Sequence, residues 1–366
     1  LGAAYLALIP PWQGPDETGH FEYAWLLAHL GRLPTGEDIQ PEFEEELLAS
    51  LYEWRYGEFI GRPLPEGMPA RLEDLPPQVF ARRARTVLTG RFSLAYLWQA
   101  LFLLPVRHQD LAVQLRVARL SSLLLNLAIV WLAFRTFSEV LPDRPRLAAA
   151  MTAVIVLLPQ HAYINSMVGD GPLAELMAGL ILYCWARFFR QGPSLWAGLA
   201  ILAGTLAGIW TKTTAVFLLP LNLGLLAWWL GRRRRWPWTR RHVALLCAGL
   251  ALLAVAGWAW LSSAIGTRTT IAISQALSGN SLQWTDQRGM TLGEGLLASH
   301  DSFWANFGWM ALPVSGRWYG AALLLSMLAA VGWLFKRDIP RCFASWGPKL
   351  MASAFFLALG VFIWVA

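Results

Sequence analysis

The chain has 366 residues, of which 56% are hydrophobic and only 14% are charged, and its mean hydropathy is +0.43. Soluble domains carry about 25% charged residues, so this composition argues against a soluble protein and indicates a membrane protein with several spans. The net charge of +7 does not indicate nucleic-acid binding, because the arginines cluster between apolar runs, as in cytoplasmic loops.

The chain starts within one apolar run and stops within another, so we expect it to be a segment of a longer protein. It contains three cysteines, and none of them has CxxC spacing: Cys184, Cys247 and Cys342. This pattern supports neither a disulfide framework nor a metal knuckle.

A membrane span needs about 20 mostly apolar residues. Nine stretches qualify, the first as the end of a span: 1–9, 117–134, 147–165, 172–189, 194–210, 214–230, 242–262, 318–335 and 349–366. We therefore predict an all-α fold, a polytopic transmembrane helical bundle. The run 92–106 is short for a span, and we predict an interfacial or re-entrant helix there.

Charge then predicts the orientation of the bundle. If 92–106 does not cross, one side receives fourteen basic residues, in loops 135–146, 187–193, 231–242 and 336–341, whereas the turns near Gly169 and Lys212 and the loop 263–317 on the other side hold four. The positive-inside rule makes the first side cytoplasmic. Two long loops, 10–116 and 263–317, are then extracytoplasmic, and residues 117–262 and 318–366 form the transmembrane parts. The prediction depends on 92–106 remaining on the outer side.

The first outer loop has helical patterns. We predict an amphipathic helix up to about Leu30 that stops at Gly31, a second over Glu42–Tyr56 and a third over Pro77–Leu88, all lying on the membrane. The loop 263–317 mixes aromatic and charged residues, which suits a lid over a polar ligand. In that loop, Arg268 is a candidate binding residue, and the alternative is an ordinary solvated loop.

The sequence Pro15-Asp16-Glu17-Thr18-Gly19-His20 follows the first apolar run directly. Ionisable groups at a membrane boundary tend to serve chemistry or transport when they face a protein cavity. Asp16 and Glu17 are therefore candidate catalytic acids, and His20 is a candidate binding residue. Helix capping is the competing interpretation, because acidic residues favour a helix N-terminus.

Asp170 lies in a tight turn between two predicted spans, with a glycine on either side and Pro172 following. Capping is again the alternative, with the proline in the first helical turn. Taken together, Asp16 and Asp170 lie at span ends on the same predicted side. Two such acids could share a divalent cation, Mg²⁺ or Mn²⁺, or a single acceptor hydroxyl.

Basic residues near the same side could bind an anion. Lys212 lies in a turn between two apolar runs, and its alternative role is a snorkelling side chain without function. Arg116 and Arg119 lie near the outer start of a span and could line a phosphate pocket or simply be interfacial. Asn165 lies near the outer end of a span, close in sequence to His161, and both could face the same cavity.

The order of these residues resembles that of the GT-C membrane glycosyltransferases. The resemblance is to a bacterial branch of uncharacterised polytopic relatives of protein mannosyltransferases and aminoarabinose transferases. It covers roughly residues 1–225. The matching marks are Pro15-Asp16-Glu17-Thr18-Gly19-His20-Phe21, Arg119-Leu120-Ser121-Ser122, Pro159 with Asn165 and Asp170, and Thr211-Lys212 with Pro220. The branch often has Pro-x where this chain has Thr18-Gly19.

This resemblance implies sugar transfer from a polyprenyl-phosphate donor at the outer face of a bacterial cytoplasmic membrane. Asp16 would activate the acceptor or bind a metal, Asp170 would be the second acid, and Lys212 with nearby arginines would hold the carrier phosphate. Membrane lipids and other membrane subunits are the expected partners, and nucleic acid is not. Two alternatives remain: a non-catalytic subunit of a larger complex, and a lipid or polysaccharide transporter. Transporters favour midplane charges, which are not seen in this pattern.

Overall fold

The computed structural model describes residues 1–35, 38, 40–59, 63–75, 92–232, 292–307 and 312–335. These residues are mostly helical, which confirms the predicted all-α class. The chain divides into two compact units, Leu1–Val216 with Leu296–Ala366, and Phe217–Gly295. The first unit holds every candidate site residue except Arg268, which lies outside the described residues.

In the described part of the chain, the α-helices are α1 Gly2–Leu8, α2 Glu17–Leu30, α3 Pro41–Glu53, α4 Tyr56–Phe59, α6 Leu94–Leu103, α7 Leu111–Val140, α8 Pro145–Leu157, α9 Pro159–Ile164, α10 Gly171–Gln191, α11 Leu195–Thr211, α12 Leu218–Arg232, α16 Leu292–Ala305 and α17 Gly316–Phe335. Short 3-10 turns span Leu72–Asp74, Leu104–Val106 and Thr213–Phe217. Strands β1 Asn306–Phe307 and β2 Leu312–Pro313 pair antiparallel.

The prediction of nine spans is not matched by the described residues, where two helices, α7 and α10, are long and apolar enough to cross a membrane. Two such helices alone are weak evidence for a membrane. Proline explains one difference: Pro159 has no amide hydrogen to continue a helix, and it splits the predicted span 147–165 into α8 and α9. Helix α11 has 17 residues, about 26 Å at 1.5 Å per residue. The predicted spans 242–262 and 349–366 lie outside the described residues.

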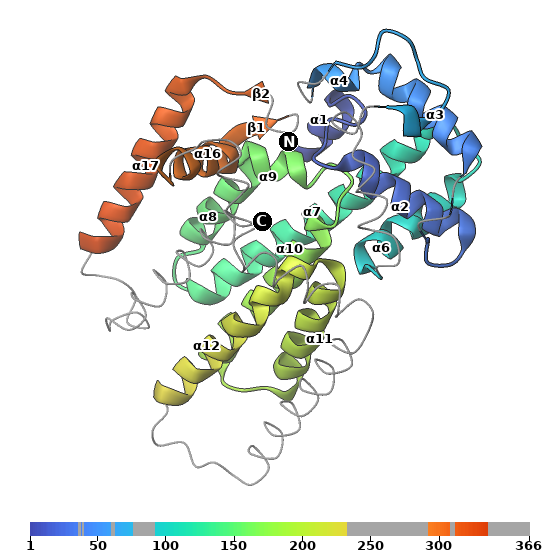
Figure 1. The fold of residues 1–366 in the computed structure, drawn as a ribbon. Coiled ribbons are helices and arrows are strands. Elements are labelled where there is room, and N and C mark those ends of the chain that lie inside the picture. Colours follow the sequence, from blue (N-terminus) through green and yellow to red (C-terminus); the bar gives the residue numbers. More distant parts are fainter. Residues whose placement is uncertain are drawn as a thin grey trace. The chain divides into compact units, whose positions relative to one another are not determined.

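Helices α2, α3 and α6 gather around the first turns of α7 (Figure 1). Helix α2 ends at Gly31, as predicted, because a left-handed residue with φ 64° stops the helix there. Its prediction as an amphipathic surface helix is wrong, since α2 is buried on nearly all sides. Helix α3 does have one buried apolar face, formed by Phe43, Leu47, Leu48 and Leu51. The predicted helix Pro77–Leu88 lies outside the described residues.

The far end of α7 is basic and meets the far end of α10. Arg190 of α10 donates to Glu139 of α7 at 3.0 Å, and Arg135 lies over the ring of Tyr183. The start of α10 lies at the opposite end of that helix, where the turn 165–170 meets α2 and α6. The candidate acids and the two described basic loops, 135–146 and 187–193, are therefore at opposite ends of the α7–α10 pair.

Candidate functional site

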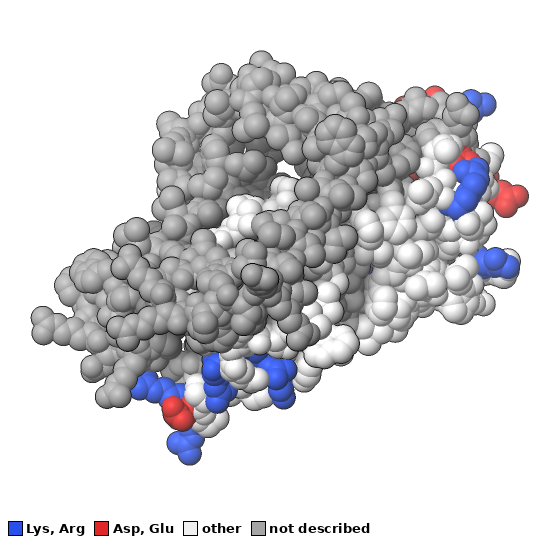
Figure 2. Space-filling view, turned by 90° about the horizontal axis from the view of Figure 1, so that it is seen from below, with Lys and Arg blue, Asp and Glu red and all other residues white. Residues whose placement is uncertain are grey.

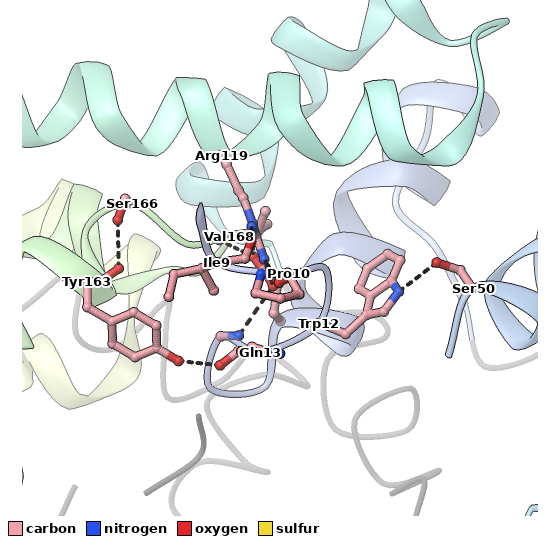
Figure 3. A network of polar contacts seen from close by, with 11 residues as sticks. Ile9, Pro10, Trp12, Gln13, Ser50, Arg119, Tyr163, Ser166 and Val168 are labelled. Atoms are coloured by element: carbon pink, nitrogen blue, oxygen red, sulfur yellow. Dashed lines mark hydrogen bonds and ion pairs between the residues drawn. The ribbon is translucent and has the colours of Figure 1, made fainter. Parts of the chain in front are cut away.

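Glu17 and Arg119 form a buried ion pair, which we call the clasp (Figure 3). Arg119 of α7 donates from Nε to Oε1 at 2.8 Å and from Nη2 to Oε2 at 2.7 Å. The backbone amides of Val168 and Gly14 also donate to Glu17, one to each oxygen. Both side chains are almost fully buried, at 0% and 3% exposed. Each carboxylate oxygen therefore has two donors, and none of its acceptor capacity faces a ligand.

The clasp also fixes the loop that leads to α2. Arg119 donates to the carbonyl oxygens of Ile9 and Pro10, at 2.6 and 2.8 Å. Trp12 donates from its indole nitrogen to Ser50 at 2.9 Å, and the hydroxyl of Tyr163 donates to the carbonyl of Gln13. Figure 3 shows these contacts converging on one short loop from three directions. The loop that carries Asp16 is thus anchored to α3, α7 and α9.

Asp16 occupies the N-cap position of α2, but its side chain makes no capping hydrogen bond. Its backbone is left-handed, with φ 51°, a conformation that aspartate and asparagine tolerate better than most residues. The carboxyl group reaches solvent, yet surrounding protein atoms partly desolvate it and raise its pKa above 3.8. The charge of Asp170 raises this pKa further, while His20 and Lys212 lower it. The capping interpretation therefore does not account for this carboxylate.

Asp170 is, like Asp16, a non-capping acid at a helix start, in this case the start of α10. It is the N-cap residue, its side chain makes no capping bond, and Lys212 lies 3.2 Å from its Oδ1. The side chain of Lys212 is 38% exposed, so its ammonium keeps donors that face solvent. Asp16 and Asp170, which were predicted to share a site, affect each other electrostatically, because the charge of Asp170 raises the pKa of Asp16. Lys212, at the end of α11, acts on both acids.

His20 completes the group one turn after Asp16 on α2. Its Nδ1 lies 2.7 Å from the hydroxyl oxygen of Tyr96 on α6. Burial is the largest influence on His20 and lowers its pKa, against the opposing effect of Asp170 and Asp16. A neutral imidazole is the favoured form in such surroundings. We call Asp16, His20, Asp170 and Lys212 the acid–lysine cluster.

Other predicted residues lie elsewhere. Arg119 is committed to the clasp, and Arg116 is exposed on α7. Asn165 is buried and donates to Glu175 at 2.9 Å, while Nε2 of His161 lies 2.8 Å from the other oxygen of Glu175. This trio ties α9 to α10. Glu175 was not predicted, because nothing in its sequence surroundings distinguishes it from an isolated acid on an apolar helix.

The predicted metal site at Asp16 and Asp170 does not gain ligands from its surroundings. Among the described residues, no three histidine, cysteine or acidic side chains come together as metal ligands. The ammonium of Lys212 already neutralises Asp170. Two carboxylates beside an ammonium do not fit the oxygen-rich shell that Mg²⁺ prefers.

Sequence reasoning missed three residues that contact the cluster or its neighbours: Ser93, the N-cap residue of α6, and Tyr96 and Gln99 within α6. Their signal is present in the sequence. They are polar residues at intervals of three in an otherwise apolar run, and this spacing puts them on one side of a helix.

No protein-family model matches this chain, and no curated protein and no solved structure matches it. The interpretation of the cluster therefore depends on its own chemistry.

Proposed function

We propose that the chain is part of an integral membrane glycosyltransferase that moves a sugar from a polyprenyl-phosphate donor to an acceptor hydroxyl at the extracytoplasmic face of the bacterial cytoplasmic membrane. The observation that carries the proposal is the acid–lysine cluster. Two carboxylates at helix starts are left unused by capping and lie with a partly exposed lysine near the start of α10.

The surface of α7 supports a membrane location. Five large apolar side chains at helical spacing are exposed along it: Leu120, Leu124, Leu127, Trp131 and Phe134. Exposed Arg116 and Arg135 bracket this stripe, 19 residues apart in the sequence. At 1.5 Å per residue they are about 28 Å apart, close to the roughly 30 Å of a bilayer core. Such a long apolar surface is unusual on a soluble monomer.

The distribution of charge supports the same arrangement. Figure 2 shows charged side chains of the described residues at two ends of one face, with an uncharged surface between them. The end with Arg135, Arg144, Arg146, Arg187 and Arg190 corresponds to the cytoplasmic side by the positive-inside rule. The cluster lies at the other end of α10 and so faces the extracytoplasmic side in this proposal.

The chemistry follows from the charges. The acceptor oxygen attacks the anomeric carbon of the donor, its proton passes to Asp16, and the bond from that carbon to the phosphate oxygen breaks. The raised pKa of Asp16 makes its carboxylate a stronger base than an ordinary aspartate. The phosphate leaves with the electron pair, and the ammonium of Lys212 takes up its charge. Asp170 holds Lys212 in place at 3.2 Å.

A direct assay tests this proposal. The purified full protein in lipid nanodiscs is given a panel of radiolabelled polyprenyl-phosphate sugars with hydroxyl acceptors, and release of sugar is measured. We expect turnover of one donor by the wild type and a loss of at least a hundredfold in Asp16→Asn and Asp170→Asn. Asp143→Asn is the matched control, because Asp143 is exposed in the loop at the basic end.

Two outcomes contradict the proposal. Equal turnover by Asp16→Asn, Asp170→Asn and the wild type removes the acids from the chemistry. Absence of turnover in the wild type with every donor favours the non-catalytic subunit instead.

A further inference from the structure

Helix α6 and its N-cap residue Ser93 present three polar side chains at intervals of three residues, and each contacts a different segment of the site through a hydrogen bond. The hydroxyl of Ser93 donates to the carbonyl of Thr211 at 2.9 Å, the residue just before Lys212. The hydroxyl oxygen of Tyr96 lies 2.7 Å from Nδ1 of His20. The amide nitrogen of Gln99 donates to the carbonyl of Gly169 at 2.8 Å, the residue just before Asp170.

These three side chains are buried, at 7% exposed for Ser93 and 1% each for Tyr96 and Gln99. A spacing of three keeps side chains on one side of a helix over two turns. The segments that they reach come from three separate elements: the end of α11, the first turns of α2 and the turn before α10. The turn before α10 also contacts the other two segments, through Val168 with Glu17 and through Asp170 with Lys212, and α6 adds one further hydrogen bond to each of the three segments.

We propose that this side of α6, formed by Ser93, Tyr96 and Gln99, is a positioning template that sets the relative places of His20, Asp170 and Lys212. None of the three is a catalytic residue, because each acts through a neighbour. The template rests on the proposed function for its catalytic meaning, but its geometry is testable without any substrate.

The rest of α6 agrees with this role. On another side of the helix, the indole nitrogen of Trp98 donates to the carbonyl of Ser121 at 3.1 Å and ties α6 to α7. The ring of Tyr96 also packs on Tyr23 of α2, with centroids 4.7 Å apart. These contacts pack α6 against α2 on one side and α7 on another.

Tyr96 has the most specific effect to measure. The template assigns the hydroxyl of Tyr96 as the donor and Nδ1 of a neutral His20 as the acceptor, which leaves the ring proton on Nε2. The charged groups that act on His20 are Asp16, Asp170, Lys212 and Glu17, and none of them is altered by Tyr96→Phe. A change in the tautomer of His20 in Tyr96→Phe therefore reports the loss of the hydrogen bond and not a change in the electrostatic environment of the ring.

The first experiment is nuclear magnetic resonance of the full protein in nanodiscs with ¹⁵N-labelled histidine, with His20 assigned by His20→Gln. We expect Nδ1 of wild-type His20 to give the signal of an unprotonated acceptor, and Tyr96→Phe to give a mixture of tautomers. Trp98→Phe is the matched control, because it also removes one hydrogen bond of α6 but faces α7. Unchanged His20 signals in Tyr96→Phe, or the same change in Trp98→Phe, would overturn the template.

The second experiment measures sugar release by Ser93→Ala, Tyr96→Phe and Gln99→Met beside Trp98→Phe. Loss of one buried hydrogen bond predicts a decrease of about three- to tenfold in each of the first three and little change in the fourth. Equal decreases in all four would show a general loss of packing and contradict the template. If the wild type turns over no donor, the proposed function fails while the resonance experiment still decides the template.

Discussion

Asp16 and Glu17 are neighbours in the sequence, yet their carboxylates are used in opposite ways. Glu17 is fully buried, has two donors on each oxygen and is paired with Arg119. Asp16 reaches solvent, makes no capping bond and interacts with Asp170, His20 and Lys212. An acidic pair at a helix start can therefore serve two purposes: one acid holds the loop, and the other keeps an uncapped carboxylate that the proposed reaction uses.

The largest expected effect is on folding. Glu17→Ala leaves the guanidinium of Arg119 buried without its partner, which typically costs about 3–5 kcal/mol. Thermal unfolding in nanodiscs should show a marked loss of stability. The matched control is Arg190→Gln, which removes an exposed ion pair and should cost at most about 1 kcal/mol. Equal midpoints for Glu17→Ala and the wild type would contradict the role of the clasp.

The next effect is on donor turnover. Lys212→Met removes the charge that the proposed reaction needs for the leaving phosphate, and a charged hydrogen bond of about 1.5–3 kcal/mol corresponds to a decrease of roughly ten- to 150-fold. Arg116→Met, at the edge of the exposed stripe of α7, should leave turnover per folded molecule unchanged. Normal turnover in Lys212→Met with a loss of turnover in Arg116→Met would instead indicate that Arg116 binds the phosphate.

A smaller effect is expected at the second anchor of the loop. Trp12→Phe removes the hydrogen bond to Ser50, worth about 1 kcal/mol, together with one ring of the buried indole, which adds a packing cost. Thermal unfolding measures this cost, with Ser50→Ala as the partner variant. If the loss of stability in the double variant equals the sum of the losses in the two single variants, the hydrogen bond does not couple the loop to α3.

The smallest expected effect is a gain in stability instead of a loss. The raised pKa of Asp16 means that the folded protein disfavours its ionised form, so the ionised carboxylate lowers stability at neutral pH. Asp16→Asn should therefore unfold at a slightly higher temperature than the wild type at pH 7. The difference should disappear below the ordinary aspartate pKa of 3.8, where both side chains are neutral. A destabilised Asp16→Asn at pH 7 would contradict this assignment.

Part of this arrangement could be predicted from the sequence. Asp16, His20, Asp170 and Lys212 stand out because they are polar residues at the ends of apolar runs, and the count of basic residues placed them on one side. The stop of α2 at Gly31 and the buried face of α3 follow from local patterns. These signals are local, and the structure brings the four residues together.

The rest depends on contacts between distant parts of the chain. Glu17 and Arg119 are 102 residues apart in sequence, so no local pattern reveals that they neutralise each other. The sequence could not decide whether Asp16 and Asp170 cap their helices, because capping depends on where a side chain turns. Hydropathy alone also overlooked the break at Pro159, which divides an apolar run into two helices.

The most direct test compares neighbouring substitutions on the same samples, with folding and sugar release measured side by side for Asp16→Asn and Glu17→Gln. Asparagine tolerates the left-handed backbone of residue 16, so the first variant isolates the loss of charge. We expect Asp16→Asn to be folded and inactive, and Glu17→Gln to be strongly destabilised. A folded Asp16→Asn with wild-type turnover would contradict the central claim that Asp16, and not Glu17, performs the chemistry.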